Sequence, residues 1–483
     1  MVQRPPLNAM KKQLLSLLCW FCLTVTASQA QNLEWVSKTG SQFNPTSTKT
    51  FFADKYGAVA DGKTNNAKSI QKAIDACAKA GGGVLRFKPG SYMTGAIFLK
   101  DNVQLQIDKD VLILGSEHVE DYPEIDTRIA GIEMKWPSAL INVNDIKNSS
   151  VTGEGIVNAR GKFNWDLYWR MRKEYEAKGL RWIVDYDAKR VRTLLVQNSS
   201  NITIKGLIFK NAGFWTVQLL YSRNITVDGV IIRNNEDGSG PSTDGIDIDS
   251  SSWVLIENCD IDCNDDNFCL KAGRDWDGLR VNRPTEYVVI RKSIARRGGG
   301  LVTLGSETSG GIRHVLASDL TATHTDNGFR IKSAVTRGGV IEDIYFQNVR
   351  MDSINVAFQF NLNWNPSYSY STLPKGYDPD TLPAHWRAML NKVEPAEKGI
   401  PLAKDIYVSN VTVTNANTVF SGTGLKNSAL KNFNFSKASI SAALLGAVEY
   451  ASDWNFIDFS ISIIPKSIQL KNVSGKENEE RLK

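Results

Sequence analysis

The segment Asn201-Ile-Thr-Ile-Lys-Gly-Leu-Ile-Phe209 recurs 23 residues later as Asn224-Ile-Thr-Val-Asp-Gly-Val-Ile-Ile232. Each copy has a short β-branched run, a bend marked by Asn, Gly or Asp, and a second short run, which is typical of one coil of a solenoid. Looser copies begin at Val254, Val288, Val315, Ile344 and Ile406. Such coils bury their apolar side chains only by stacking, about 4.8 Å apart with parallel strand pairing. The repeats therefore predict an all-β fold, a single-stranded parallel β-helix.

Other segments depart from this repeat. Residues 65–80 carry Ile70, Ile74 and Cys77 at helical spacing, which predicts a short helix that caps the exposed N-terminal end of the solenoid. Two insertions, residues 163–191 and 363–400, are rich in aromatic side chains, and the first also contains Arg170, Arg172, Lys173 and Arg181. Two interpretations of both insertions stay open: a surface that stacks sugar rings and holds anionic groups, or an aromatic patch that packs the insertion onto the solenoid.

The first thirty residues differ in kind from the rest. Lys11 and Lys12 precede an apolar run that ends in small residues up to Ala30, which is typical of a secretory signal peptide. We therefore predict a signal peptide at residues 1–30, a lead-in at 31–49, a β-helix domain that carries any chemistry at 50–473, and a charged tail at 474–483. A periplasmic or secreted protein, cleaved near Ala30 and monomeric, is expected.

The charge balance limits the possible partners. The chain has 57 Lys and Arg against 51 Asp and Glu, and loss of the leader removes three basic residues, so 54 minus 51 leaves a net charge of +3. This charge is too small for a nucleic-acid binder. After the leader, no apolar run approaches the roughly 18 residues that a membrane span needs. We expect neither nucleic-acid binding nor membrane insertion.

Four cysteines remain after the leader: Cys77, Cys259, Cys263 and Cys269. Four are too few for a disulfide scaffold in a chain of this length, although an exported protein could form a disulfide. Cys259 and Cys263 have a zinc-like spacing, but the sequence has no second pair of Cys or His that would complete a four-ligand zinc site. We favour buried thiols in strands, and expect no metal; the disulfide state of Cys259, Cys263 and Cys269 stays open.

Three carboxylates are expected to meet. Alignment of the inward apolar pairs places Thr243 to Ile248 beside Asp265 to Leu270, a step of 22 residues, so Asp244 stacks on Asp266. Asp265 adds a third acid, and repulsion among the three would raise the pKa of at least one. A structural ladder of acids at the bends is the alternative. Asp244 lies two residues before the inward residue Ile246, so regular strand alternation would direct its side chain inward as well. The backbone must therefore bend here.

Two cations follow on later coils. Gly298, Gly299 and Gly300 lie on the next equivalent strand and leave room for a ligand beside the acids. One coil further, Phe329 and Ile331 face inward, so Arg330 and Lys332 face outward about 7 Å apart. Such a pair suits an anionic substrate, because Arg binds a carboxylate in bidentate fashion and Lys adds a point charge. Simple charge balance of the acids is the alternative.

These motifs resemble those of glycoside hydrolase family 28, the polygalacturonase and rhamnogalacturonan hydrolase group, whose motifs are N-T-D, D-D, G-H-G and R-I-K on a right-handed parallel β-helix of the pectin-lyase type. Here they read Ser242-Thr243-Asp244, Asp265-Asp266, Gly298-Gly299-Gly300 and Arg330-Ile331-Lys332, in the same order. Ser242 stands at the position of the family's Asn. Gly299 stands at the position of its His.

The resemblance implies an inverting mechanism. Asp265 would be the general acid that protonates the departing glycosidic oxygen, and Asp244 and Asp266 would hold and deprotonate the attacking water. Arg330 and Lys332, with Gly299 beside them, would bind the substrate and its galacturonate carboxylate. No cofactor is implied.

The function expected is hydrolysis of α-galacturonosyl linkages in pectic polysaccharide or oligogalacturonide. A rhamnogalacturonan-backbone hydrolase or a galacturonidase is the first alternative, since the position of Gly299 differs from polygalacturonases. A calcium-dependent pectate lyase that uses the same acids, or a catalytically silent β-helix that only binds polysaccharide, is the second. Whether cleavage occurs inside the polymer or at its end stays open.

Overall fold

The computed structural model describes residues 33–45 and 47–464. The predicted signal peptide and the predicted charged tail lie outside the described residues. The chain divides into two units, residues 1–38 and 39–483. In the first unit, the described part holds the 3-10 helix η1 (Glu34–Lys38).

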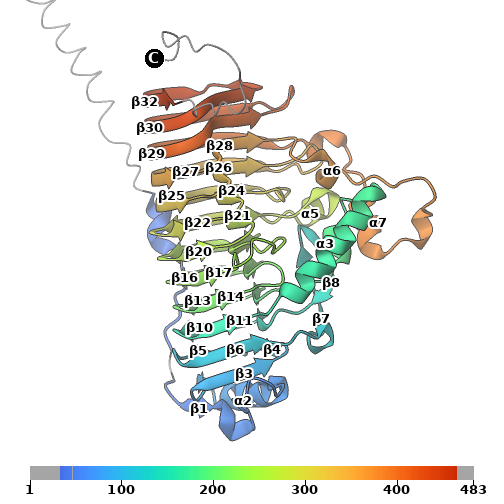
Figure 1. Cartoon of the computed structure of the whole chain (residues 1–483), viewed down its shortest axis with the longest axis vertical. Helices are drawn as coiled ribbons and strands as arrows, with labels where there is room; N and C mark the ends of the chain where they lie inside the picture. The colour runs from blue at the N-terminus through green and yellow to red at the C-terminus, as the bar shows by residue number, and fades with distance from the viewer. Residues whose placement is uncertain (1–32, 46, 465–483) are drawn as a thin grey trace, which may run out of the picture. The chain divides into compact units, whose positions relative to one another are not determined.

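The second unit is a parallel β-helix, as predicted, in which strands from successive coils form three stacks (Figure 1). The first stack contains β1 (Thr50–Phe52), β2 (Gly83–Arg86), β5 (Val103–Ile107), β10 (Lys147–Gly153), β13 (Ser200–Lys205), β16 (Arg223–Asp228), β19 (Ser252–Glu257), β22 (Thr285–Arg291), β25 (Ile312–Thr323), β27 (Val340–Asp352), β29 (Leu402–Thr423), β30 (Leu430–Glu449) and β32 (Asn455–Ile463). The short β31 (Ala451–Ser452) pairs with β30.

The other two stacks complete each coil. The second contains β3 (Gly90–Thr94), β6 (Val111–Gly115), β11 (Ile156–Asn158), β14 (Ile208–Lys210), β17 (Ile231–Arg233), β20 (Asp260–Asp262) and β23 (Ile294–Ala295), and continues into β25. The third contains β4 (Ile97–Phe98), β9 (Ile141–Asn144), β12 (Leu194–Gln197), β15 (Val217–Leu220), β18 (Ile246–Asp249), β21 (Asp266–Lys271), β24 (Gly300–Leu304), β26 (Asn327–Lys332) and β28 (Val356–Asn361), and continues into β29.

The core runs along the inside of the coils. The predicted repeats pair in one continuous row of buried side chains: Ile202, Ile225, Val254, Val288, Val315, Ile344 and Ile406. The row continues to Phe433 of β30, a copy that the sequence did not predict. Each fully buried side chain of this kind contributes about 1.5–3 kcal/mol, as an upper estimate. The repeat read from the sequence is therefore the inward face of the first stack.

The predicted capping helix is α2 (Ala67–Lys79), which buries Ile70, Ile74 and Cys77. It follows the short η2 (Ala53–Tyr56) and lies beside β1 and β3 at the N-terminal end of the solenoid (Figure 1). The side chain of Gln71 exchanges hydrogen bonds with the backbone of Phe98, which ties the helix to β4. In the part of the chain that the structure describes, no helix is long and apolar enough to cross a membrane.

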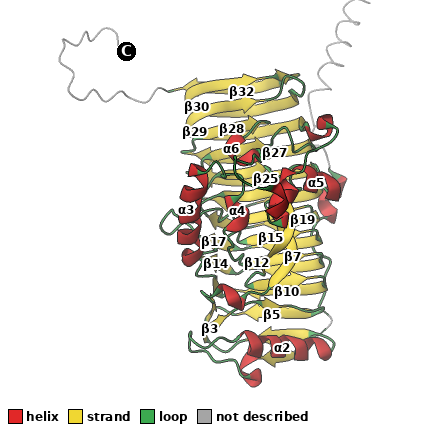
Figure 2. Cartoon of the chain, turned by 90° about the vertical axis from the view of Figure 1, so that its right-hand side faces the viewer, coloured by secondary structure: helices red, strands yellow, loops and turns green. Residues whose placement is uncertain are grey.

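The predicted insertions contain helices. The first has α3 (Lys162–Ala177) and α4 (Val184–Asp187), and the second has α6 (Pro366–Ser369), η4 (Pro379–Thr381), α7 (Ala384–Leu390) and η5 (Ala396–Gly399). The sequence did not predict η3 (Val119–Asp121), the antiparallel hairpin β7 (Glu124–Ile129) and β8 (Ile132–Pro137), or α5 (Asp275–Val281). Figure 2 shows that α3, α4, α5 and β7 lie on the side of the solenoid that carries β12 and β15, in the third stack.

The four cysteines among the described residues, Cys77, Cys259, Cys263 and Cys269, are free and buried. Cys77 is in α2, as its helical spacing predicted, and Cys269 is in the strand β21; the prediction of strands was wrong for Cys259 and Cys263, which lie in the bends beside β20. Each bend turns an inward side chain toward the core, so a small apolar thiol fits there as well as in a strand.

Candidate active site

The candidate catalytic residues come from four consecutive strands of the third stack. Ile246 pairs with Phe268 and Ile248 with Leu270, so β18 and β21 have the predicted step of 22 residues. Phe268 then pairs with Val302 of β24, and Val302 with Phe329 of β26. The stacking of the inward residues therefore carries Asp244, Asp265, Asp266, Gly299, Arg330 and Lys332 to one side of the solenoid.

The bend that the sequence required lies just before β18. Asp244 precedes the first residue of that strand, Ile246, so strand alternation does not fix its direction. Ser242, two residues earlier, has a φ of 50°. The intervening Gly245 packs so closely that a Cβ there would lie 2.4 Å from the carbonyl oxygen of Asn267. Only glycine allows this approach.

The structure brings the three acids together. One carboxylate oxygen of each of Asp244, Asp265 and Asp266 lies within 4.8 Å of one oxygen of each of the others. Asp266 is fully buried and accepts hydrogen bonds from Lys332 Nζ at 2.7 Å and Thr303 Oγ1 at 2.7 Å. Asp265 is half-buried, and Asp244 is buried with an Oδ1 that accepts no hydrogen bond. Asp244 and Asp265 are thus less fully engaged by hydrogen bonds than Asp266, so they are the acids available to a ligand.

The surroundings separate the proton affinities of these acids. Burial, and then the charge of Asp266, raise the pKa of Asp265. Burial, and then Asp247 and Asp265, raise the pKa of Asp244 well above its usual value. Burial would also raise the pKa of Asp266, but Lys332 and Arg330 outweigh burial and lower it. One acid is therefore held ionised while its neighbours favour a proton.

The two predicted cations bind an acid of the site. Lys332 is buried and bonded to Asp266, and Arg330 lies 3.5 Å from Asp266 Oδ1 and donates to Gln359 Oε1 at 2.6 Å. Both therefore balance the charge of Asp266, and Lys332 also lines the pocket described next. Gly299 packs beneath the acids, since a Cβ there would lie 3.2 Å from Asp266 Oδ1 and 3.3 Å from Asp265 Oδ1.

A pocket of about 490 Å³, including open solvent at its mouth, lies over this cluster. Of the predicted residues, Asp244, Asp265 and Lys332 line it. Its other lining residues are Ala130, Arg181, Asp185, Phe214, Trp215, Ser242, Lys271, Ser306, Glu307, Trp364 and Tyr368.

Sequence reasoning missed three charged residues of this site, Asp247, Lys271 and Glu307. The ammonium group of Lys271 lies 3.3 Å from Glu307, 3.5 Å from Asp247 and 3.7 Å from Asp244. The alternation that places Ile246, Ile248, Phe268 and Leu270 inside would have placed Asp247 and Lys271 outside. Glu307 follows β24 in a segment without a repeat pattern, so no such signal existed for it.

The aromatic insertions pack onto the solenoid, and some of their side chains also reach the pocket. Most of their large side chains pack, as Trp182, Tyr186 and Trp386 do in one buried cluster with the β7–β8 hairpin. A few line the pocket: Arg181 from the first insertion lies 5.0 Å from the ring of Tyr368 from the second, and Trp364 lies beside Lys332. The insertions therefore form part of the pocket through a minority of their side chains.

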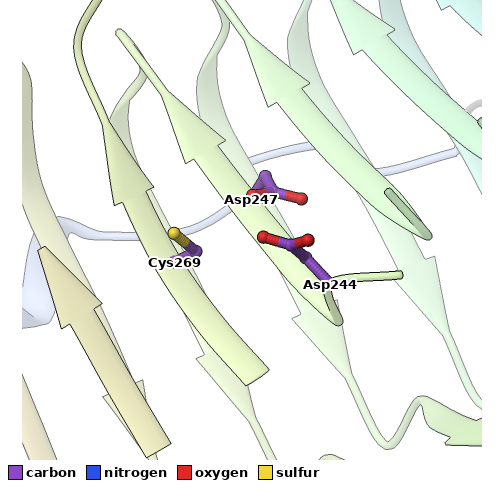
Figure 3. Close-up of side chains that lie close together, drawn as sticks. All are labelled: Asp244, Asp247 and Cys269. Atoms are coloured by element: carbon purple, nitrogen blue, oxygen red, sulfur yellow. The ribbon is translucent and has the colours of Figure 1, made fainter. Parts of the chain in front are cut away.

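Two groups of side chains have ligand atoms close enough for one metal ion: Asp244, Asp265 and Asp266, and Asp244, Asp247 and Cys269. Figure 3 shows the second group, with the carboxylates of Asp244 and Asp247 directed toward each other. Ammonium groups already contact three of these acids, since Lys332 is bonded to Asp266 and Lys271 lies against Asp244 and Asp247. We therefore assign no metal to either group.

The fold and this acidic site are those of a glycoside hydrolase. The model of glycosyl hydrolases family 28 matches residues 95–368, more than half of the chain, and the chain belongs to that family. A probable polygalacturonase of Vitis vinifera is 30% identical over 377 residues, which cover 74% of this chain and 73% of the relative. The exo-poly-alpha-D-galacturonosidase of Dickeya chrysanthemi is 26% identical over 442 residues, 84% of this chain and 70% of the relative.

Solved structures show the same fold. A hyperthermoactive exopolygalacturonase from Thermotoga maritima superimposes with a TM-score of 0.71 at 24% identity, covering 88% of this chain and 94% of that one. The family 28 exopolygalacturonase of Yersinia enterocolitica gives a TM-score of 0.67 at 19% identity and covers 86% and 78%.

Proposed function

We propose that this hydrolase cleaves α-galacturonosyl linkages of pectic polysaccharide or oligogalacturonide. The observation that carries the proposal is the pair Asp265 and Asp244, two carboxyls that line one pocket beside a third, Asp266, which two cations hold ionised. Hydrolysis of a glycoside needs one carboxyl that donates a proton and another that receives one. The cluster supplies both.

Asp265 is the general acid, because it lines the pocket and its environment raises its pKa. Asp244 takes the proton of the attacking water, because its Oδ1 accepts no hydrogen bond from the protein. Asp266 is engaged by Lys332 and Thr303, so it holds the cluster and the water in place and is a weak base. Asp244 and Asp266 thus both act on the water, but Asp244 is the one that accepts its proton.

The stereochemical outcome that we propose is inversion. One oxygen of Asp265 lies within 4.8 Å of one oxygen of Asp244, closer than the roughly 6.5–9.5 Å that separates the carboxyl groups of most inverting enzymes. This short distance would favour retention, but the resemblance of the four motifs to those of the family supports inversion. Proton NMR of the first product formed decides between the two, since inversion of an α-linkage gives the β anomer.

The charge of the pocket supports a uronate substrate. Arg181, Lys271 and Lys332 line it together with the acids, so a sugar carboxylate can approach without meeting a purely anionic surface. We propose that Gly299 stands where polygalacturonases carry a His, and that the missing imidazole leaves the sugar beside Asp265 to be held by other pocket groups. A preference for rhamnogalacturonan is the consequence to test.

The position of the insertions favours attack at a chain end, as in a galacturonidase. Arg181 packs over Tyr368, and Trp182 Nε1 donates to the carbonyl oxygen of Thr372 at 2.9 Å, so the two insertions are joined beside the pocket. A closed side of this kind stops a long polymer from passing through. The names of the relatives from Dickeya chrysanthemi and Thermotoga maritima, both exo-acting, support the same proposal.

We also propose export to the periplasm or the exterior, where polymeric pectin is accessible, with cleavage near Ala30. The leader pattern of the sequence supports this location. Mass spectrometry of the protein recovered from its host would show a new N-terminus near residue 31, and an intact leader would contradict export.

One experiment tests the activity. The protein is incubated with polygalacturonate and with rhamnogalacturonan, and reducing ends, ultraviolet absorbance and product sizes are followed. New reducing ends without ultraviolet absorbance, unchanged by a chelator, are expected; an unsaturated, calcium-dependent product would show a lyase. No turnover above that of D265N on either polymer would show a silent binding protein. Release of monomers alone from the start supports the chain-end proposal.

A further inference from the structure

Lys271 occupies an unusual place in the site. It is the last residue of β21, it lines the pocket, and its side chain is 5% exposed. Its ammonium group lies within 4 Å of three carboxylates, those of Glu307, Asp247 and Asp244, and 4.9 Å from the ring centre of Trp215. A buried ammonium group with three acidic neighbours stays charged. Its charge stabilises the ionised form of each neighbouring carboxyl group.

The three acids differ in how strongly their surroundings favour the ionised form. Burial would raise the pKa of Glu307, but Lys271 and then Lys332 lower it to about 2, so Glu307 is ionised. Burial raises the pKa of Asp247 to about 8, against the effect of Lys271, and neither of its oxygens accepts a hydrogen bond. The surroundings of Asp247 therefore favour its protonated form. Asp244, whose carboxylate faces that of Asp247 in Figure 3, lines the pocket, so it is the neighbour of Lys271 whose ionisation bears on the proposed reaction.

The other neighbours of Asp244 do not replace Lys271. Burial raises the pKa of Asp244, and so do Asp247 from β18, Asp265 just before β21 and Asp266 at the start of β21, whereas Lys271 lowers it. Lys332 and Arg330 from β26 are engaged with Asp266. Arg190, which precedes β12, forms its ion pair with Asp185 at 3.1 Å.

We propose that Lys271 is a positioning residue of this site, whose ammonium group favours the ionised form of Asp244 beside the attacking water. The inference rests on the proposed hydrolysis, in which Asp244 receives a proton from that water. Glu307 also holds Lys271, at 3.3 Å, and the raised pKa of Asp247 leaves more of the charge of Lys271 to act on Asp244.

The test compares Lys271→Met, which removes the charge, with Lys271→Arg, which keeps it. Loss of an opposite charge within 4 Å raises the pKa of a carboxylate by about 1–3 units. Asp244 must be ionised to accept the proton of the water. The acid limb of the pH profile of kcat should therefore move up by about 1–3 pH units in K271M. Below that limb, kcat should fall about tenfold per unit, and activity should recover at higher pH. K271R should keep the limb of the wild type.

Other roles give other results. A residue that only binds substrate would raise KM at every pH and leave the limb in place, and a residue that only supports the fold would lower the melting temperature without moving the limb; either result overturns the proposal. Lys205→Met is the matched control, since Lys205 is 62% exposed and pairs with Asp228 in the first stack, whereas the site lies on the third. If K271M does not fold, Lys271→Gln replaces it.

A readout without turnover separates this inference from the proposed function. The infrared band of protonated carboxyl groups is followed against pH, and the part that D244N removes belongs to Asp244. In K271M that part should disappear at a pH about 1–3 units higher than in the wild type. An unchanged titration overturns the role of Lys271, whereas a wild type without activity on either polymer overturns only the proposed function.

Discussion

Replacement of Lys332 by Met removes one partner of a buried ion pair. Lys332 Nζ lies 2.7 Å from Asp266 Oδ2, and the two side chains are 8% and 0% exposed. Loss of one partner from such a pair costs about 3–5 kcal/mol, because the other charge stays buried. Thr303 and Arg330 still contact Asp266 in the variant, so the lower end, about 3 kcal/mol, is expected.

This free energy converts to a small but measurable change in melting temperature. The entropy of unfolding is about 2.1 cal/mol/K per residue, or roughly 0.9 kcal/mol/K for about 430 residues of the solenoid. The expected decrease is therefore about 3 °C near neutral pH, measured by differential scanning calorimetry at one scan rate. The exposed control K205M should change the melting temperature by less than about 1 °C.

The decrease should depend on pH with a definite sign. The pKa of Asp266 is lowered in the folded protein, so its ion pair contributes stability above the unfolded pKa of about 4, and that stability is lost as pH falls toward the folded pKa. The difference between wild type and K332M should accordingly be full at pH 7 and narrow below about pH 4. A difference that is absent at pH 7, or that widens in acid, would refute the reasoning.

Three further predictions concern chemistry and packing. Asp265→Asn should reduce kcat by about 10²–10⁴-fold with the melting temperature kept within about 1 °C; retention of most activity would mean that the general acid is another residue. The wild type should lose activity as alkaline pH removes the proton of Asp265, whose pKa burial raises, and kcat of D265N should lack this limb; a limb common to both would exclude Asp265 as its origin. Phe329→Ala removes a buried ring that stacks on Phe346 at 4.9 Å, and should cost about 3–5 kcal/mol, or about 3–5 °C, without changing the pH profile; a shifted profile would show that core packing sets the acid geometry.

The sequence predicted the solenoid well because its information is local and repeated. Every coil places an apolar side chain at the same point, so Ile225, Val254 and Val288 could be aligned from the residue pattern alone. The same alignment fixed the step from Ile246 to Phe268 and brought Asp244 to Asp266.

Features outside the repeat could not be predicted in this way. The β7–β8 hairpin and α5 each occur once, and their positions depend on contacts with distant segments, such as the hydrogen bond from Tyr186 to the carbonyl oxygen of Ala130. Glu307 and Tyr368 reach the pocket only after their segments fold over it. Lys271 and Asp247 are different, because simple alternation along β21 and β18 already places both side chains on the outer face.

The reacting acids and the remainder of the pocket have different supports. Asp244, Asp265 and Asp266 are attached to neighbouring rungs, whose separation is set by backbone hydrogen bonds, whereas Arg181 and Tyr368 belong to insertions. Randomisation of residues 163–191 and 363–400 should consequently yield variants that accept different polymers while releasing products of one unchanged anomeric form. Such a scaffold would let the choice of polymer change while the positions of the three acids stay the same.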